Sequence, residues 1–250
     1  SSAPSRWALA AERWCPQGPA YLLPPEGTAC EAAFVWLQGP GSTPESWAHR
    51  LAPIWEELGR RWMFVALRAP RIRISCCGGE RLEAWADVLG RDCVHVGSAD
   101  HDNPDDAGHF AATAALVRRT LNELEQFHSV PPSRVVIGGF SQGAAAALEA
   151  ALRYPRRVAG CVVLSGWLLP AARAALAASP SRGVPCLVCH GARDDKVGID
   201  CGESAKQALE EAGASVEFRA LPGLGHAVSP RELTAVGRFL RGVLSGAATA

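Results

Sequence analysis

The sequence predicts an α/β protein in which a mostly parallel sheet is covered by helices on both faces. From about residue 30 onward, short apolar runs alternate with longer segments of helical periodicity, as in chains whose parallel strands are joined by crossover helices. The chain has 250 residues, enough to bury a substantial core in one domain. We therefore expect a single domain over residues 31–244, an irregular arm over residues 1–30 and a fraying tail over residues 245–250.

Six short apolar runs are the expected strands, and each is bounded by turn-forming or charged residues. They cover Ala32 to Leu37, Trp62 to Leu67, Val135 to Gly138, Ala159 to Leu164, Val184 to Cys189 and Val216 to Leu221. The last run places Val216, Phe218 and Ala220 on one side, as expected for a half-exposed strand near the edge of the sheet. The proline-rich arm also contains a short candidate strand around Tyr21 to Leu23.

Three segments have the pattern of helices. Phe110 to Phe127 carries apolar residues at helical spacing, and the prolines that follow end it. An alanine-rich run from Ala144 to Tyr154 is the second helix. The third begins at Ser229 to Glu232, which reads as a capping box with proline at the first helical position. Apolar residues continue on one face of this last helix, so we expect it to pack on the sheet.

The charge balance argues against two classes of partner. Lysine and arginine together number 25, as do aspartate and glutamate, so the formal net charge is zero. The chain lacks the basic excess that nucleic-acid binding requires. Its apolar runs are also far shorter than the roughly 20 residues that span a bilayer. We expect neither a nucleic-acid partner nor an integral membrane segment.

The cysteines favour a reducing compartment. There are nine of them at irregular spacing, and Cys161, Cys186 and Cys189 lie in apolar runs, where thiols behave as small hydrophobic groups. We therefore expect a cytoplasmic location. The chain begins with Ser1 rather than methionine, which leaves open a targeting segment removed ahead of it.

The sharpest local motif is Gly-Phe-Ser-Gln-Gly at Gly139 to Gly143. It follows the predicted strand that begins at Val135 and precedes the alanine-rich helix, so the context is strand, tight turn and helix. In this arrangement the glycines permit a strained turn and a close approach of helix and strand, and the serine hydroxyl is exposed above a helix N-terminus. The motif predicts an α/β-hydrolase fold with Ser141 as the nucleophile.

In that fold the acid and then the histidine follow the serine along the chain, which limits the candidates. His190 lies at the end of a predicted buried strand, whereas His226 lies in a loop before the last helix, so His226 is the expected general base. The acid is Asp194 or Asp195, in the turn after the strand that ends at Cys189. Its role is to accept a hydrogen bond from the distal imidazole N–H and so to fix the tautomer.

Two cysteine patterns resemble metal-binding motifs, but neither is expected to bind a metal. Cys186 to His190 matches the C-x-x-C-H pattern of covalent haem attachment. Its cysteines are in an apolar β-type run, however, and side chains three apart on a strand point to opposite faces. Cys76 and Cys77 are adjacent and lack the spacing of zinc ligands. We expect no metal.

Beyond these motifs, the chain resembles the carboxylesterase/phospholipase group that includes acyl-protein thioesterases and lysophospholipases. The resemblance runs from about Ala32 to Leu240, and four stretches carry it. They are Pro132 to Gly143, Leu164 to Leu168, Cys189 to Gly191 with Asp194 three residues further on, and Gly223 to His226. The resemblance favours Asp194 over Asp195 as the acid. It also implies that the segment from Arg71 to Ala84 is a loop that shapes the acyl site.

The resemblance implies hydrolysis of a fatty-acyl thioester or carboxylic ester through an acyl-enzyme on Ser141, without a cofactor. Its substrate would be an acylated protein or a lysolipid, with at most transient contact with a membrane surface. The oligomeric state is not implied. Gln38, Trp85 and Trp167 are the candidate substrate-binding residues, although a buried tryptophan is more often part of the core.

One position departs from the family pattern. The first oxyanion loop of the family reads His-Gly-Leu-Gly-Asp and uses the N–H of its leucine, whereas residues 38–42 here read Gln-Gly-Pro-Gly-Ser. Pro40 therefore occupies the donor position without an N–H. The expected donors are the N–H of Gln142 together with Gly41, Ser42 or the Gln38 side chain, or Gly39 if the alignment is shifted by one residue.

Three functions follow from these observations. The first is an acyl thioesterase or esterase acting on lipidated protein or lysolipid. The second is a carboxylesterase of small esters, because the sequence does not size the acyl pocket. The third is a non-catalytic domain that binds an acyl chain or a protein, in which Pro40 has disabled the oxyanion site. The complete set of Ser141, Asp194 and His226 argues against the third.

Overall fold

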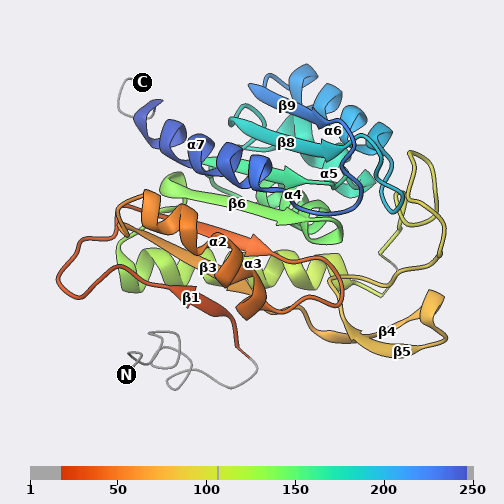
Figure 1. The fold of residues 1–250 in the computed structure, drawn as a ribbon, viewed down its shortest axis with the longest axis horizontal. Coiled ribbons are helices and arrows are strands. Elements are labelled where there is room, and N and C mark those ends of the chain that lie inside the picture. The colour runs from red at the N-terminus through yellow and green to blue at the C-terminus, as the bar shows by residue number, and fades with distance from the viewer. Residues whose placement is uncertain (1–17, 106, 247–250) are drawn as a thin grey trace.

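The structure, a computed structural model, describes residues 18–105 and 107–246 and is organised around a seven-stranded sheet (Figure 1). The strand order is β1-β3-β2-β6-β7-β8-β9, and all neighbouring strands are parallel except the pair β1 and β3. The strands are β1 (Ala20–Leu22), β2 (Ala32–Leu37), β3 (Trp62–Leu67), β6 (Val135–Phe140), β7 (Gly160–Leu164), β8 (Cys186–Gly191) and β9 (Val216–Leu221). The predicted α/β fold with a mostly parallel sheet is confirmed.

The strand boundaries agree closely with the apolar runs of the sequence. The bounds of β2, β3 and β9 are those expected, and β9 forms an edge of the sheet with all its side chains partly buried or exposed. The strands β6 and β8 each continue two residues beyond their apolar runs, to Phe140 and Gly191. Both extensions carry the polypeptide to the carboxyl edge of the sheet, where the candidate catalytic residues lie.

Helices cover both faces of the sheet, as predicted (Figure 1). The helices are α2 (Pro44–Glu57), α3 (His109–His128), α4 (Gln142–Arg153), α5 (Pro170–Ala175), α6 (Ile199–Glu211) and α7 (Pro230–Gly246). One face of β2, with Phe34 and Trp36, joins a core cluster with α2 and α7. The other face, with Val35 and Leu37, joins a second cluster with α3, α4, α5 and α6. Because both faces of β2 are covered, all its side chains are buried, each large one contributing about 1.5–3 kcal/mol.

Neither α2 nor α6 was predicted from the sequence. The buried face of α6 consists largely of small residues, among them Cys201, Gly202 and Ala205, and no side chain caps its start. The helix α2 contains Pro53, a residue that normally argues against a helix interior. Thr43 caps α2 by accepting a hydrogen bond from the Ser46 N–H at 3.3 Å, and Pro44 occupies the first helical position.

The segment expected as a loop between Arg71 and Ala84 is instead a β-hairpin. The strands β4 (Arg71–Ile74) and β5 (Glu80–Glu83) pair antiparallel and form a separate two-stranded sheet. A 3₁₀ turn at Ser75–Cys77, followed by Gly78 with a φ of 67°, joins them. Figure 1 shows this hairpin extending away from the main sheet. The alternation of arginine and isoleucine in β4 is the sequence signal for it.

The bounds of the first strand and of the last helix differ slightly from those predicted. The short leading strand is present as β1, one residue earlier than predicted. The last helix continues to Gly246, so the expected tail from residue 245 is still helical at its start. Residues 1–17 of the expected arm and residues 247–250 of the expected tail lie outside the described residues.

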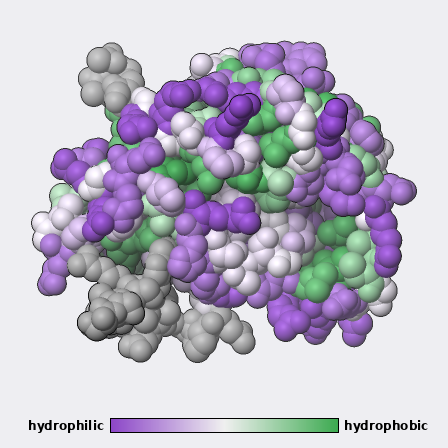
Figure 2. Space-filling view, in the orientation of Figure 1, coloured by the Kyte–Doolittle hydropathy of each residue, from purple (hydrophilic) through white to green (hydrophobic). Residues whose placement is uncertain are grey.

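Among the residues that the structure describes, none of the helices combines the length and the apolar composition that a membrane span needs. Figure 2 shows hydrophilic side chains over most of one face of the molecule, with smaller apolar areas between them.

Gly143 provides a test of the close approach between α4 and the end of β2. A β-carbon at this position would clash with the carbonyl oxygens of Leu37 and Gln38 at the end of β2. We expect Gly143→Ala to lower the free energy of unfolding by about 3 kcal/mol or more, because backbone atoms cannot move aside as side chains do. Urea denaturation measures the change.

The matched control is Gly242→Ala in α7, where nothing lies within 4 Å of the added carbon. Here alanine should stabilise the protein by about 0.5–1 kcal/mol through its better helix propensity. Equal effects of the two substitutions would contradict the proposed close approach at Gly143.

Candidate active site

Ser141 occupies the sharp turn between β6 and α4. Its φ of 58° and ψ of −130° lie in a region that residues with a side chain rarely adopt. The Ser141 N–H donates to the Leu164 carbonyl at 2.9 Å, and the Ser141 carbonyl accepts from Ala144 at 2.9 Å. The backbone is thereby fixed on both sides of the strained residue. The turn has the strand–turn–helix context that the sequence motif predicts.

The structure brings Ser141, Asp194 and His226 together from three separate loops. The His226 Nε2 atom lies 3.0 Å from the Ser141 Oγ, and its Nδ1 atom lies 2.8 Å from the Asp194 Oδ2. The residues are 85 and 32 positions apart in sequence from His226, so only the fold places them in contact. This arrangement can relay a proton from a serine hydroxyl to an imidazole whose other nitrogen is held by a carboxylate.

Asp194 is held as a carboxylate by its surroundings. Its side chain is fully buried. Burial tends to raise the pKa of Asp194, but the hydrogen bonds from His226 and from the N–H groups of Val197 and Lys196 outweigh it and hold the pKa below its usual value. Asp195, the other candidate acid, is 76% exposed and pairs with Lys196 at the surface. The geometry therefore distinguishes the two aspartates that the motif alone leaves open.

The His226 ring is positioned by packing as well as by hydrogen bonds. Phe140, directly before the serine, lies against it with the ring centroids 4.8 Å apart. Gly191 lets the loop that carries His226 pass closely over the end of β8, because a β-carbon there would clash with the carbonyls of Leu224 and Gly225. The serine turn, the end of β8 and the histidine loop are thus packed as one unit.

Glu232 anchors the other end of the histidine loop. Its carboxylate accepts from the Ser229 N–H at 2.7 Å and from the Ser229 Oγ at 2.9 Å, while the Glu232 N–H lies 3.3 Å from that hydroxyl. These contacts form the predicted capping box at the start of α7. The side chain is completely buried, and burial raises the pKa of Glu232. A buried carboxylate therefore fixes the loop that carries His226.

His190 is unsuited to act as the base. It is completely buried in β8, and its Nε2 atom lies 2.8 Å from the Val197 carbonyl, so that nitrogen carries a proton. Burial lowers the pKa of His190 and keeps the ring neutral. Its hydrogen bond holds the end of the turn that presents Asp194, which gives it a supporting position.

The oxyanion loop differs from the expectation at Gly41. The N–H of Gly41 donates to the Glu83 carbonyl at 3.0 Å, and the Ser42 N–H donates to the Gly39 carbonyl at 3.3 Å. Neither group is therefore offered to a reacting oxygen. Pro40 has no N–H to offer. The backbone of Gly39 passes directly beside the serine, since a β-carbon there would be 3.4 Å from the Ser141 Cβ.

Gln38 and Trp85 support this loop from behind. The Trp85 indole N–H donates to the Gln38 carbonyl at 2.6 Å, and both side chains are completely buried. The Gln38 amide donates to the Ser42 carbonyl at 3.3 Å. These residues were expected to contact substrate, but their partners are protein groups and neither side chain is accessible.

The Gln142 side chain has a structural role that the sequence analysis did not predict. Its amide oxygen accepts from the Trp85 N–H at 2.9 Å, and its amide nitrogen donates to the Ala86 carbonyl at 2.9 Å. The first residue of α4 is thereby tied to the segment after the hairpin. A polar side chain directly before a buried alanine run is the only signal of this role in the sequence.

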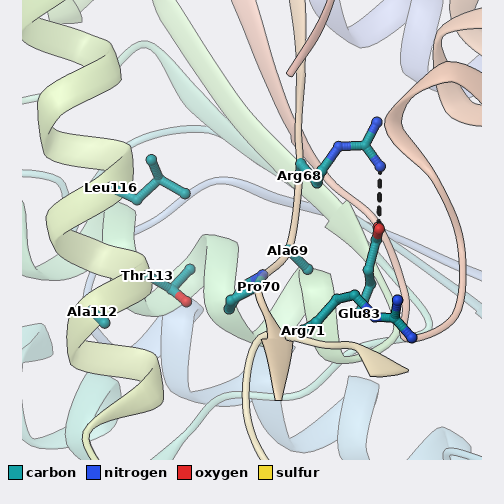
Figure 3. A pocket seen from close by; sticks show the side chains of 8 residues that line it. All are labelled: Arg68, Ala69, Pro70, Arg71, Glu83, Ala112, Thr113 and Leu116. Carbon is teal, nitrogen blue, oxygen red and sulfur yellow. Dashed lines mark hydrogen bonds and ion pairs between the residues drawn. The ribbon is translucent and has the colours of Figure 1, made fainter. Parts of the chain in front are cut away.

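A cavity of about 560 Å³ lies beside this support but contains none of the three candidate catalytic side chains (Figure 3). It is lined by Arg68, Ala69, Pro70, Arg71, Glu83, Ala112, Thr113 and Leu116. In Figure 3 the side chains of α3 face those of the segment between β3 and β4 across the cavity. Trp167, the remaining candidate substrate residue, does not line it and is 4% exposed.

The cysteines of the C-x-x-C-H pattern are core residues. Cys186 and Cys189 are buried in β8 and pair in register with β7. Over the ranges 18–105 and 107–246, no three His, Cys, Asp or Glu side chains are grouped closely enough to hold a metal ion.

Known proteins resemble the chain over almost all of its length. A family model described as phospholipase/carboxylesterase matches residues 25–244. An acyl-protein thioesterase 1 of Neurospora crassa is 31% identical over 226 residues, covering 88% of this chain and 89% of that protein. A probable carboxylesterase of Oryza sativa subsp. japonica is 32% identical over 237 residues, covering 90% of this chain and 85% of that protein.

A solved structure shares the fold. The crystal structure of Arabidopsis thaliana SOBER1 superposes with a TM-score of 0.73 at 29% sequence identity, covering 85% of this chain and 99% of that one.

The raised pKa of Glu232 predicts a pH-dependent contribution to stability. A carboxyl whose pKa is higher in the folded protein contributes most below its unfolded pKa, and the contribution is lost as the pH rises through the folded pKa. Glu232→Gln keeps the oxygen that accepts from Ser229 and removes the charge. We expect the variant to gain stability relative to wild type as the pH rises from 4 to 7, as measured by urea unfolding at each pH.

Glu203→Gln, which removes an exposed carboxylate of α6, is the matched control. If Glu232→Gln were less stable than wild type by the same amount at every pH, the ionised carboxylate would not carry the burial cost inferred here.

The two adjacent aspartates provide a direct test of the site. Asp194→Asn leaves the shape but removes the acceptor that fixes the His226 tautomer, so labelling of Ser141 by a fluorophosphonate should slow by up to about 10⁴-fold. Asp195→Asn changes an exposed side chain and should alter the rate by no more than about twofold. Stopped-time labelling with a fluorescent probe measures both rates. A large loss with Asp195→Asn instead would reassign the acid.

Proposed function

The chain belongs to the phospholipase/carboxylesterase family, and from this premise we propose that it hydrolyses fatty-acyl thioesters or carboxylic esters through an acyl-enzyme on Ser141. One observation carries the proposal: the His226 ring lies within hydrogen-bonding distance of both the Ser141 hydroxyl and the Asp194 carboxylate. A general base held in this way is what makes a serine hydroxyl nucleophilic near neutral pH.

In the first half of the reaction, His226 Nε2 accepts the Ser141 proton as Oγ attacks the carbonyl carbon. The buried Asp194 carboxylate accepts a hydrogen bond from the Nδ1–H of His226, keeps Nε2 free of a proton in the resting state and stabilises the imidazolium that forms. His226 then donates its proton to the leaving thiolate or alkoxide. The acyl group remains on Ser141.

The developing oxyanion is stabilised by backbone N–H groups. Gln142 is the first residue of α4, so its N–H has no acceptor within the helix and points with the positive end of the helix dipole. Gly39, which lies against Ser141, supplies the second donor in our proposal. With these two donors the oxyanion is stabilised even though Pro40 has no N–H to donate.

In the second half of the reaction, water replaces the leaving group. His226 accepts a proton from the water as it attacks the acyl carbon, and then returns this proton to the Ser141 oxygen. The same two N–H groups stabilise the second tetrahedral intermediate. The free enzyme and the carboxylic acid product are formed without any cofactor in this proposal.

The substrate class in this proposal is an acylated protein or a lysolipid, with contact with a membrane surface at most transient. The relative in Neurospora crassa is named an acyl-protein thioesterase, which supports the first alternative. All cysteines of the part of the chain that the structure describes are free, which supports a reducing, cytoplasmic location.

A carboxylesterase of small esters is the second candidate, because the rice relative is named a probable carboxylesterase. The non-catalytic binding domain is less well supported. Binding alone does not require a histidine that contacts both Ser141 and a buried aspartate.

Ser141→Ala tests the proposal and chain length separates the substrate classes. We expect hydrolysis of acyl thioesters and p-nitrophenyl esters, in a series from acetyl to palmitoyl, to peak at medium or long chains in the wild type. Without its nucleophile the variant should lose about 10⁴- to 10⁶-fold in kcat, with an unchanged thermal unfolding curve.

The matched control is Ser215→Ala, an exposed serine before β9 at the opposite edge of the sheet, which should retain full activity. A peak at acetyl would favour the small-ester carboxylesterase. Wild-type turnover no higher than that of Ser141→Ala at any chain length would leave a binding domain.

A further inference from the structure

We propose that Cys76 and Cys77 form a redox modification site, at which a low-molecular-weight disulfide such as oxidised glutathione converts the two thiols to a reversible vicinal disulfide. We further infer that this oxidation slows the hydrolytic reaction. The effect on rate rests on the proposed function, whereas the modification itself does not.

The two thiols already lie side by side. Cys76 and Cys77 are neighbours in the 3₁₀ turn that joins β4 and β5, and their sulfur atoms are 3.8 Å apart. Both side chains are partly exposed, and the space beside the following Gly78 is open, since nothing lies within 4 Å of a β-carbon built there. A small disulfide reagent can therefore reach the pair.

A disulfide between adjacent residues is strained and easily reduced. Neighbouring Cα atoms are about 3.8 Å apart across a trans peptide bond, shorter than the 4.4–6.8 Å usual for disulfides. Strained disulfides have higher reduction potentials than structural ones and occur as labile or regulatory bonds. Reversible oxidation is also the behaviour expected of a disulfide in a reducing compartment.

The turn is connected to the oxyanion site by a short series of hydrogen bonds. The Cys76 N–H donates to the Val88 carbonyl at 3.0 Å, and the Ser75 N–H donates to the Asp87 carboxylate at 2.7 Å. The residues immediately before, Trp85 and Ala86, are those held by the Gln142 amide.

Ring closure changes the backbone of the turn, so these bonds must rearrange. Because the Gln142 N–H is a proposed oxyanion donor, a shift of its side-chain partners would displace that donor. We expect a loss of roughly tenfold in kcat, less than the about 10²- to 10³-fold that follows complete removal of a donor.

The chemical step is a two-stage thiol–disulfide exchange. The thiolate of one cysteine attacks a sulfur of oxidised glutathione, forms a mixed disulfide and releases one glutathione thiolate. The second cysteine loses its proton to solvent and attacks the protein sulfur of the mixed disulfide, which releases the second glutathione. Two protein thiols are oxidised and one glutathione disulfide is reduced to two thiols.

The surroundings make this exchange slow at neutral pH. Burial, followed by the neighbouring Cys77 thiol, raises the pKa of Cys76, and Asp100 adds to this, whereas Arg91 acts in the opposite direction. Because the thiolate is the nucleophile, the oxidation is best carried out at about pH 8.5.

The experiment compares the wild type with Cys76→Ser, Cys77→Ser and the control Cys93→Ser, which removes a partly buried cysteine outside the pair. Each protein is incubated with oxidised glutathione, remaining thiols are alkylated, and the peptide containing residues 76 and 77 is analysed by mass spectrometry. Turnover of an acyl ester is measured before oxidation, after it, and after dithiothreitol.

In the wild type and in Cys93→Ser we expect both thiols of this peptide to be protected with the loss of two hydrogens. Turnover should fall roughly tenfold and be restored by dithiothreitol. In Cys76→Ser and Cys77→Ser no internal disulfide can form, so turnover should change little.

Alkylation of both cysteines, or only a glutathione adduct on one of them, would overturn the modification site. This outcome is read from the wild-type peptide alone and needs neither serine variant to fold. A complete disulfide with unchanged turnover would overturn the effect on rate. If the reduced wild type has no turnover at all, the proposed function fails and with it the inferred effect, while the mass spectrum still decides the modification.

Discussion

The close approach of three backbone segments at Gly143 is the constraint on which the site depends. Gly143 of α4 contacts the carbonyls at the end of β2, and Gly139 of β6 contacts Gly143 in turn, so neither position has space for a β-carbon. This contact forces the chain through the strained conformation of Ser141 and places the serine hydroxyl at the carboxyl edge of the sheet. The strain is balanced by hydrogen bonds to neighbouring backbone groups and by the core beneath α4.

The same contact determines which backbone lies beside the serine next to Pro40. Since β2 ends against α4, Gly39 lies beside Ser141 whatever residue follows it. The N–H groups of Gly41 and Ser42 are bonded within the protein, which fixes the loop. Behind it, the Gln142 amide and the Trp85 indole connect the oxyanion loop, the helix α4 and the segment after the hairpin. Buried side chains thus support the backbone of the two donors that we propose, Gly39 and Gln142.

The sequence identifies those parts of the structure that depend on local pattern. The strands β2, β3 and β9 follow from apolar runs, and the position of Ser141 follows from glycines at fixed offsets. The helix α6 was not predicted, because its buried residues are mostly small and no capping side chain marks its start. The partners of Gln142 and Gly41 could not be predicted either, since hydrogen bonds between residues far apart in sequence depend on the packing of the hairpin against the oxyanion loop.

The most direct test of this account is a crystal structure of the protein after reaction with a fluorophosphonate. The account predicts phosphorus bonded to the Ser141 Oγ and the phosphonyl oxygen within hydrogen-bonding distance of the N–H groups of Gly39 and Gln142, with the Gly41 N–H still bonded to Glu83. An adduct on another residue would contradict the assignment of the nucleophile. A phosphonyl oxygen that faces Gly41 or solvent instead would contradict the oxyanion site described here.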